Sequence, residues 1–166
     1  SKFMGEFLCS YFGKKNNSPT TIIRYHNIYG PRMGNKHVIP EFIMRIASKK
    51  DPFTLTGIKE TRAFCFIEDA IKGTFAVATN KSCIGETIHI GNSKEEITIG
   101  NLALLIMKKM NCFLEIKDLG RNSSSVSRRC PDTSKLKETT GFNSKIKLEN
   151  GIRLTIPYYI KKNIRL

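Results

Sequence analysis

His26, Asn27 and Arg62 are three side chains of this 166-residue sequence whose chemistry could bind an anionic or polar ligand. The planar guanidinium of an arginine can bind two oxygens of a phosphate or carboxylate group at once. Two of these residues also have plainer alternatives. Asn27 could satisfy the backbone of a turn, and Arg62 could form a structural ion pair. Whether they form a ligand site depends on the elements that carry them.

A buried strand that ends in a sharp turn is predicted to position His26 and Asn27. Residues 20–25 are rich in apolar and β-branched side chains, which favours a strand, and the Gly30-Pro31 pair must end it. Open α/β sheets bind ligands in the crevice at the carboxyl ends of their strands. We therefore expect this polar loop to lie at the ligand-binding edge of such a sheet.

The rest of the chain alternates between helical and extended patterns. Apolar spacing predicts helices over residues 1–12, 37–47, 68–78, 98–110, 133–140 and 148–160. Extended runs predict strands over 53–56, 87–92 and 113–116, and a polar loop follows at 120–127. Thr98 should cap its helix, and Asp69 is interpreted as a helix-start residue. Pro157 should end or kink the final helix.

Composition narrows the classes of partner and site. The net charge is +14, but the lysines are scattered, so we expect no nucleic-acid partner. The chain contains no apolar run of about 18 residues and no signal-peptide pattern, which predicts a cytoplasmic protein with no membrane partner. Five cysteines without a C-x-x-C pair are interpreted as buried free thiols, and the spacing of the three histidines predicts no metal site.

Four blocks of sequence resemble the extended short-chain dehydrogenase/reductases of the nucleotide-sugar epimerase, dehydratase and decarboxylase group. The blocks are RYHNIYGPRM at 24–33, TRAFCFIED at 61–69, IHIGN at 88–92 and RRCPDTSK at 128–135. They follow the family's order and cover nearly the whole chain, with the epimerase and decarboxylase branches the most similar. The resemblance implies an α/β fold: the C-terminal part of a Rossmann-type extended short-chain dehydrogenase, with a small α/β substrate-binding lobe.

The same resemblance implies that residues 1–166 are a single fragment, the nucleotide-sugar-binding part of a longer enzyme. The family's catalytic element is Tyr-x-x-x-Lys. Lys2, followed by Gly5-Glu6, is similar to its lysine, so the tyrosine would lie three residues before Ser1. The glycine-rich loop that binds a dinucleotide is not in the sequence, and the first helix opens without a cap. We therefore expect the N-terminal NAD-binding Rossmann portion to be absent, and the fragment alone to be inactive. The alternative for Lys2 is a solvent-facing lysine at a helix start.

The family's binding residues can be carried over to matching positions. Lys2, Tyr25 and His26 would contact the cofactor, NAD. The expected substrate-binding residues are Asn27, Arg32, Thr54, Thr56, Arg62, Arg128 and Arg129. Of these, Asn27, Arg62 and the Arg128-Arg129 pair would bind the diphosphate, and Thr54 and Thr56 the uracil or thymine base. Thr54 and Thr56 could instead be ordinary strand residues, and the arginine pair surface charge. Arg32 is expected to contribute for a different reason, because it precedes a helix start that could bind an anion.

The resemblance implies an NAD-dependent UDP-sugar 4-epimerase that acts through a transient 4-keto sugar in surface-polysaccharide sugar synthesis. Alternatives are a UDP-glucuronate decarboxylase and a dTDP-sugar dehydratase, and the substrate is a UDP-sugar or dTDP-sugar in each case. Two other classes stay open: a non-catalytic nucleotide-sugar-binding remnant and a basic nucleic-acid binder. The intact protein is expected to be a homodimer.

Overall fold

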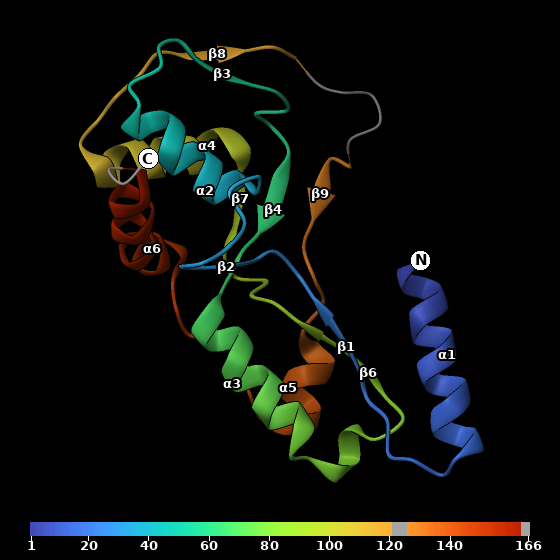
Figure 1. Ribbon diagram of the computed structural model, residues 1–166. Helices are drawn as coiled ribbons and strands as arrows, with labels where there is room; N and C mark the ends of the chain where they lie inside the picture. Colours follow the sequence, from blue (N-terminus) through green and yellow to red (C-terminus); the bar gives the residue numbers. More distant parts are fainter. Residues whose placement is uncertain (121–125, 164–166) are drawn as a thin grey trace.

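The computed structural model describes residues 1–120 and 126–163 (Figure 1). Residues 121–125 of the expected 120–127 loop lie outside the described residues. Its elements in chain order are α1 (Lys2–Lys15), β1 (Ile22–Tyr25), β2 (Ile28–Tyr29), α2 (Val38–Ala47), β3 (Phe53–Leu55), β4 (Thr61–Ala63), β5 (Cys65–Phe66), α3 (Ile67–Ala78), the 3-10 turn η1 (Lys81–Cys83), β6 (Thr87–Ile90), β7 (Glu96–Thr98), α4 (Ile99–Met110), β8 (Ile116–Asp118), β9 (Arg128–Arg129), α5 (Ser134–Thr140) and α6 (Leu148–Asn163). None of the described helices combines the length and the hydropathy needed to cross a bilayer.

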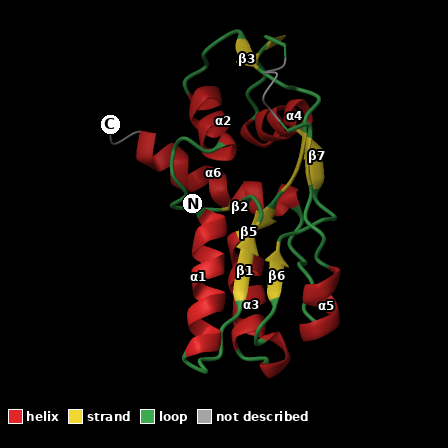
Figure 2. Cartoon of the chain, turned by 90° about the vertical axis from the view of Figure 1, so that its right-hand side faces the viewer, coloured by secondary structure: helices red, strands yellow, loops and turns green. Residues whose placement is uncertain are grey.

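A parallel pair of strands forms one region of the molecule. β1 pairs with β6 in a register that places Arg24 opposite His89 and Tyr25 opposite Ile90. The pair lies between α1 on one side and α3 and α5 on the other (Figure 1). Figure 2 shows α1 beside β1, with its first turn toward the carboxyl end of that strand. The predicted strand over 20–25 is therefore present, and its polar carboxyl end lies at one edge of the pair.

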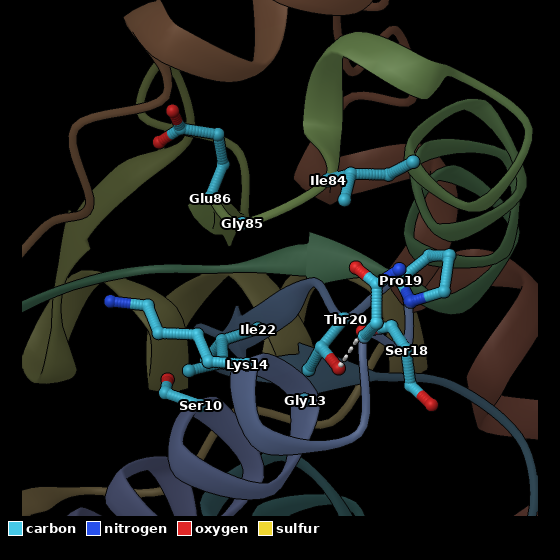
Figure 3. A pocket seen from close by; sticks show the side chains of 11 residues that line it. Ser10, Gly13, Lys14, Ser18, Pro19, Thr20, Ile22, Ile84, Gly85 and Glu86 are labelled. Carbon is cyan, nitrogen blue, oxygen red and sulfur yellow. Dashed lines mark hydrogen bonds between the residues drawn. The ribbon is translucent and has the colours of Figure 1, made fainter.

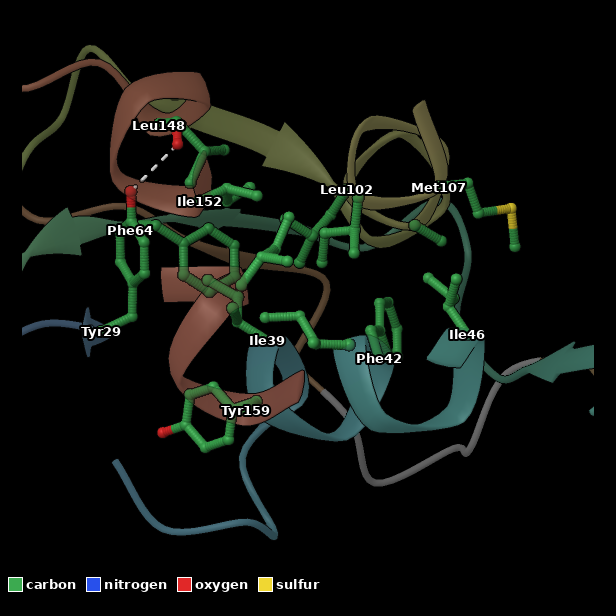
Figure 4. Packing of buried hydrophobic residues seen from close by; sticks show 14 of the residues in the cluster. Tyr29, Ile39, Phe42, Ile46, Phe64, Leu102, Met107, Leu148, Ile152 and Tyr159 are labelled. Atoms are coloured by element: carbon green, nitrogen blue, oxygen red, sulfur yellow. Dashed lines mark hydrogen bonds between the residues drawn. The ribbon is translucent and has the colours of Figure 1, made fainter. Parts of the chain in front are cut away.

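The second region is a lobe of three helices and short strands. Buried side chains of α2, α4 and α6 form its core, together with aromatic residues of β2, β3 and β5 (Figure 4). The ring of Phe42 packs edge-on against Phe53, with ring centroids 5.2 Å apart. Thr98 caps α4 as predicted, because its side-chain oxygen accepts a hydrogen bond from the Asn101 N–H.

A three-stranded sheet connects this lobe to the rest of the chain. β4 is its central strand, antiparallel to β7 and parallel to β9, and the register places Arg62 opposite Arg129. Asp69, in the first turn of α3, is buried and accepts hydrogen bonds from the backbone N–H groups of Lys145 and Ile146. The structure thus uses this carboxylate to hold the segment that leads into α6.

Two expectations about secondary structure are corrected: the start of one strand, and the possibility that Pro157 ends the last helix. The strand expected over 113–116 begins only at Ile116, because β8 pairs with β3 from Phe53 onward. The last helix continues through Pro157 to Asn163. A proline costs one hydrogen bond inside a helix, here to the carbonyl of Arg153. The buried side chains of Ile156 and Tyr159 keep the helix packed in the lobe on both sides of the proline.

The apolar stripe predicted over residues 1–12 does form a helix, but no residue of α1 is buried within the described chain. Phe3 is 78% exposed and Phe7 58% exposed. The prediction that the cysteines are buried is therefore wrong for Cys9, which α1 presents to solvent. Cys65 and Cys83 are buried, and all five thiols are free.

Candidate functional site

A pocket of about 400 Å³ lies where α2 faces β3, β4 and β9. Five of the residues predicted to bind substrate line it: Asn27, Thr54, Thr56, Arg62 and Arg129. They come from four segments that are far apart in the sequence. The fold therefore brings together polar and cationic groups that the sequence could only place on separate elements.

Arg62 is the most enclosed cation of this pocket, with 12% of its side chain exposed. Its Nη2 lies 2.7 Å from Oε2 of Glu60, and Nη1 donates to the Thr61 carbonyl at 2.8 Å. The structural ion pair that the sequence left open as an alternative is thus present. The same contacts hold the guanidinium in place at the pocket wall, where an anion would be poorly screened by solvent.

The two neighbouring arginines of β9 have separate roles. Arg129 is opposite Arg62 and lines the pocket. Arg128 turns the other way and binds both carboxylate oxygens of Glu96, each at 2.8 Å. Hydrogen bonds from Arg128 and Thr61 lower the pKa of Glu96 to about 2. Only one arginine of the pair expected to bind the diphosphate therefore faces the pocket, because successive strand residues point to opposite faces.

Asn27 links the end of β1 to the three-stranded sheet. Its side-chain Nδ2 donates to the Ala63 carbonyl at 2.9 Å, and its backbone has a positive φ of 42°. Asn27 therefore lines the pocket while its side chain bonds to the backbone of β4, and no described side-chain hydrogen bond of Asn27 goes to its own turn. Arg32, by contrast, is exposed in the loop before α2 and does not line this pocket.

Sequence reasoning missed three charged residues of the pocket: Glu60, which pairs with Arg62, and Glu41 and Arg45 on α2. Arg45 Nη1 lies 3.2 Å from Glu41 Oε1, and Arg45 Nη2 donates to the Thr54 carbonyl at 2.6 Å. The available signal for Glu41 and Arg45 was the spacing of four residues between an acid and a base, which puts both on one face of the predicted helix.

The three predicted cofactor residues do not line this pocket. Lys2 is exposed in the first turn of α1, and Tyr25 ends β1 with its hydroxyl 2.8 Å from Thr74 Oγ1. An ion pair between Arg24 and Glu6, 2.6 Å apart, ties α1 to β1. The hydroxyl of Tyr25 points to α3, on the side of the strand pair away from α1 and Lys2. The sequence contains no glycine-rich loop for the phosphates of a dinucleotide.

His26 forms a pair with His89, which the sequence did not predict. Nε2 of His26 lies 2.6 Å from Nδ1 of His89, and the two rings are stacked with centroids 4.8 Å apart. One ring nitrogen must donate and the other accept, so the shared contact requires that one of the two nitrogens be unprotonated. Burial, followed by the charges of His89 and Arg24, lowers the pKa of His26.

Acidification is therefore expected to destabilise the protein around this histidine pair. Between the lowered pKa of His26 and its ordinary value of about 6.5, the unfolded chain binds more protons than the folded chain. The resulting stability is present above about pH 6.5 and is lost as the pH falls. Urea midpoints of the full-length protein at about pH 7.5 and about pH 5.5 measure the effect.

The variant His26→Asn should flatten this pH dependence, and the exposed control His37→Asn should leave it unchanged. The carboxylates with lowered pKa, such as Glu96, lose their contribution only in a more acidic range, so they do not obscure the test. An equal pH dependence in wild type and His26→Asn would contradict the assignment.

A separate pocket of about 340 Å³ lies between the end of α1 and the start of β1 (Figure 3). Lys14, Thr20 and Glu86 are among its lining residues. None of the residues predicted to bind cofactor or substrate lines this pocket. It is also at the amino ends of β1 and β6, whereas α/β sheets bind ligands at the carboxyl ends.

Comparison with known proteins gives consistent matches. A family model described as the NAD dependent epimerase/dehydratase family matches residues 1–91. A UDP-N-acetyl-alpha-D-glucosaminuronate decarboxylase of Bacillus cytotoxicus is 32% identical, over 95% of this chain and 51% of that protein. UDP-glucuronic acid decarboxylase 1 of Xenopus tropicalis is 30% identical, over 97% of this chain and 38% of that protein.

Among solved structures, the UDP-glucuronic acid 4-epimerase of Bacillus cereus, in complex with UDP-glucuronic acid and NAD, matches with a TM-score of 0.88 and 28% identity. The match covers 97% of this chain and 51% of that one. It confirms the predicted fold, an α/β C-terminal part of a Rossmann-type extended short-chain dehydrogenase. The chain spans about half the length, or less, of the curated relatives it matches. Since the family model covers more than half of its residues, this chain belongs to the NAD-dependent epimerase/dehydratase family.

Proposed function

We propose that the full-length protein that carries this chain is an NAD-dependent UDP-sugar 4-epimerase, and that this chain is its nucleotide-sugar-binding part. The pocket that gathers Asn27, Thr54, Thr56, Arg62 and Arg129 carries this proposal. The ligand named in the 28% identical epimerase structure supports a UDP-sugar. The chain covers 51% and 38% of the two curated relatives described above, which supports an NAD-binding portion elsewhere in the protein, before residue 1 in our proposal.

In this proposal the polar residues of the pocket contact different parts of the substrate. Arg62 and Arg129, opposite each other on β4 and β9, hold the two negatively charged phosphates of the substrate. Thr54 and Thr56 lie beside the nucleobase. Asn27, which follows β1, orients the diphosphate so that the sugar extends toward Tyr25 and His26.

The reacting end of the sugar would then lie at the carboxyl end of β1. Lys2, on the first turn of α1, would contact the nicotinamide ribose, and Tyr25 and His26 would flank the nicotinamide. NAD, when bound, supplies reversible hydride acceptance at carbon 4, so that the sugar passes through a transient 4-keto form. The positive charge of Lys2 would lower the pKa of a tyrosine placed one helical turn before it, which suits proton removal from the sugar hydroxyl.

A UDP-hexuronate decarboxylase is the second candidate, because the two curated relatives described above are decarboxylases of UDP-linked uronic acids. Both activities share the 4-keto form. In a 4-keto hexuronate the carboxylate is β to the ketone, so loss of carbon dioxide gives a pentose.

Incubation of the full-length protein with UDP-glucose, UDP-glucuronate and dTDP-glucose, followed by proton NMR of the products, tests the proposal. Inversion at carbon 4 of a UDP-sugar is the expected result. Conversion of UDP-glucuronate to a UDP-pentose would identify a decarboxylase, and a 4-keto-6-deoxy product a dehydratase. Saturable UDP binding with no turnover would contradict the proposal that the protein is an enzyme. Binding of RNA that falls steeply with salt, and that UDP does not displace, would overturn the site itself.

A further inference from the structure

The third arginine of the pocket has surroundings unlike those of Arg62 and Arg129. Arg45 is on α2, and its guanidinium carbon lies 4.2 Å from the centroid of the Phe53 ring. Its Nη1 pairs with Glu41, and its Nη2 donates to the carbonyl of Thr54 at 2.6 Å and lies 3.3 Å from Thr54 Oγ1. One face of the guanidinium and two of its edges are therefore occupied by protein.

The side chain of Arg45 is only partly covered by protein. It is 26% exposed, whereas Phe53, against which one face of the guanidinium packs, is fully buried. Arg45 is also one of the residues that line the pocket. A flat cation held at its edges, with one face open, can stack on a planar ring.

We propose that Arg45 is the platform on which the nucleobase of the substrate stacks. The inference rests on the proposed function and assigns one residue to one part of the ligand. Arg62 and Arg129 form a cationic wall from β4 and β9, which suits the diphosphate. Arg45 and Thr54 form a wall from α2 and β3, which suits the base. Since the guanidinium is already held by Glu41, Thr54 and Phe53, stacking costs little side-chain entropy.

The same contacts of Arg45 also involve the backbone carbonyl of Thr54, next to the expected position of the base. The Thr54 carbonyl accepts a short hydrogen bond from Arg45, so the strand backbone presents this carbonyl already paired with a cation. In the proposal Arg45 therefore acts in two ways: the base stacks on its guanidinium, and its hydrogen bond to Thr54 fixes the backbone of β3 beside the base.

Titration of the full-length protein with UDP and with inorganic pyrophosphate, which has no base, separates this role from phosphate binding. Arg45→Lys retains the charge but loses the flat face. It should weaken UDP binding about 5- to 150-fold, the range for loss of one base stack, and leave pyrophosphate binding unchanged. Arg62→Ala should weaken both ligands. Arg153→Lys, at an exposed arginine of α6, is the matched control and should change neither.

Unchanged UDP affinity in Arg45→Lys, or an equal loss for both ligands, would overturn the stacking role while leaving the proposed function standing. Absence of UDP binding by the wild type would overturn the proposed function itself. If Arg45→Lys does not fold, Glu41→Ala provides the test, because it frees one edge of the guanidinium. It also removes a negative charge from the pocket wall, which favours both anions, so UDP binding should gain less than pyrophosphate binding, and an equal gain for both ligands would count against the proposal.

Discussion

Replacement of Arg62 by alanine in the full-length protein is expected to weaken UDP binding about 10- to 150-fold, equivalent to about 1.5–3 kcal/mol. Only 12% of the Arg62 side chain is exposed, so its interaction with a phosphate would be little screened. The variant also removes the Arg62 guanidinium from beside the Glu60 carboxylate, whose side chain is 10% exposed. The remaining carboxylate would repel an anionic ligand.

Isothermal titration of wild type and variants with UDP measures this effect. Arg62→Lys retains the charge but not the planar fork, and should lie between wild type and Arg62→Ala. Glu60→Gln in the Arg62→Ala background should recover part of the loss by removing the repulsion. Arg153→Ala, on the exposed face of α6, controls for the loss of one positive charge from the whole molecule. An unchanged UDP affinity in a folded Arg62→Ala variant would remove Arg62 from the site.

Replacement of Gly151 by alanine should destabilise the protein by about 1–3 kcal/mol, although alanine favours helices. Gly151 is buried in the first turn of α6. A Cβ atom there would lie 2.0 Å from the Tyr29 hydroxyl oxygen and 2.8 Å from the Phe66 ring. Tyr29 is 2% exposed and donates to the Leu148 carbonyl, so it cannot move aside without breaking buried contacts.

The urea midpoint of the full-length protein measures this prediction, and Gly5→Ala is the matched control. Gly5 is also in a helix, but a Cβ atom added there would have nothing within 4 Å, so alanine should stabilise by about 0.5–1 kcal/mol. Adding Tyr29→Phe to Gly151→Ala removes the nearest atom and should recover part of the stability. A Gly151→Ala protein as stable as wild type would show that α6 does not pack as described.

Much of the secondary structure could be predicted because it depends on neighbours in the chain. The helical spacing of apolar residues predicted α2, α3 and α4, and Thr98 caps α4 through a bond three residues away. β8 could not be placed in the same way. Its limits depend on pairing with β3, some 60 residues earlier, and local sequence contains no information about that register.

The candidate site also has features that local sequence predicts and features that depend on distant segments of the chain. The sequence by itself determined the family, through its four blocks, and the identity of Asn27, Thr54, Thr56, Arg62 and Arg129 as polar groups worth following. Only the tertiary structure decided that these five line one pocket, that Arg128 turns away to Glu96, and that Arg45 joins them from α2. The reason is physical: residue type and spacing specify local backbone and the available chemistry. Which side chains meet is decided by strand register and by helix packing between distant segments, and these depend on the whole chain at once.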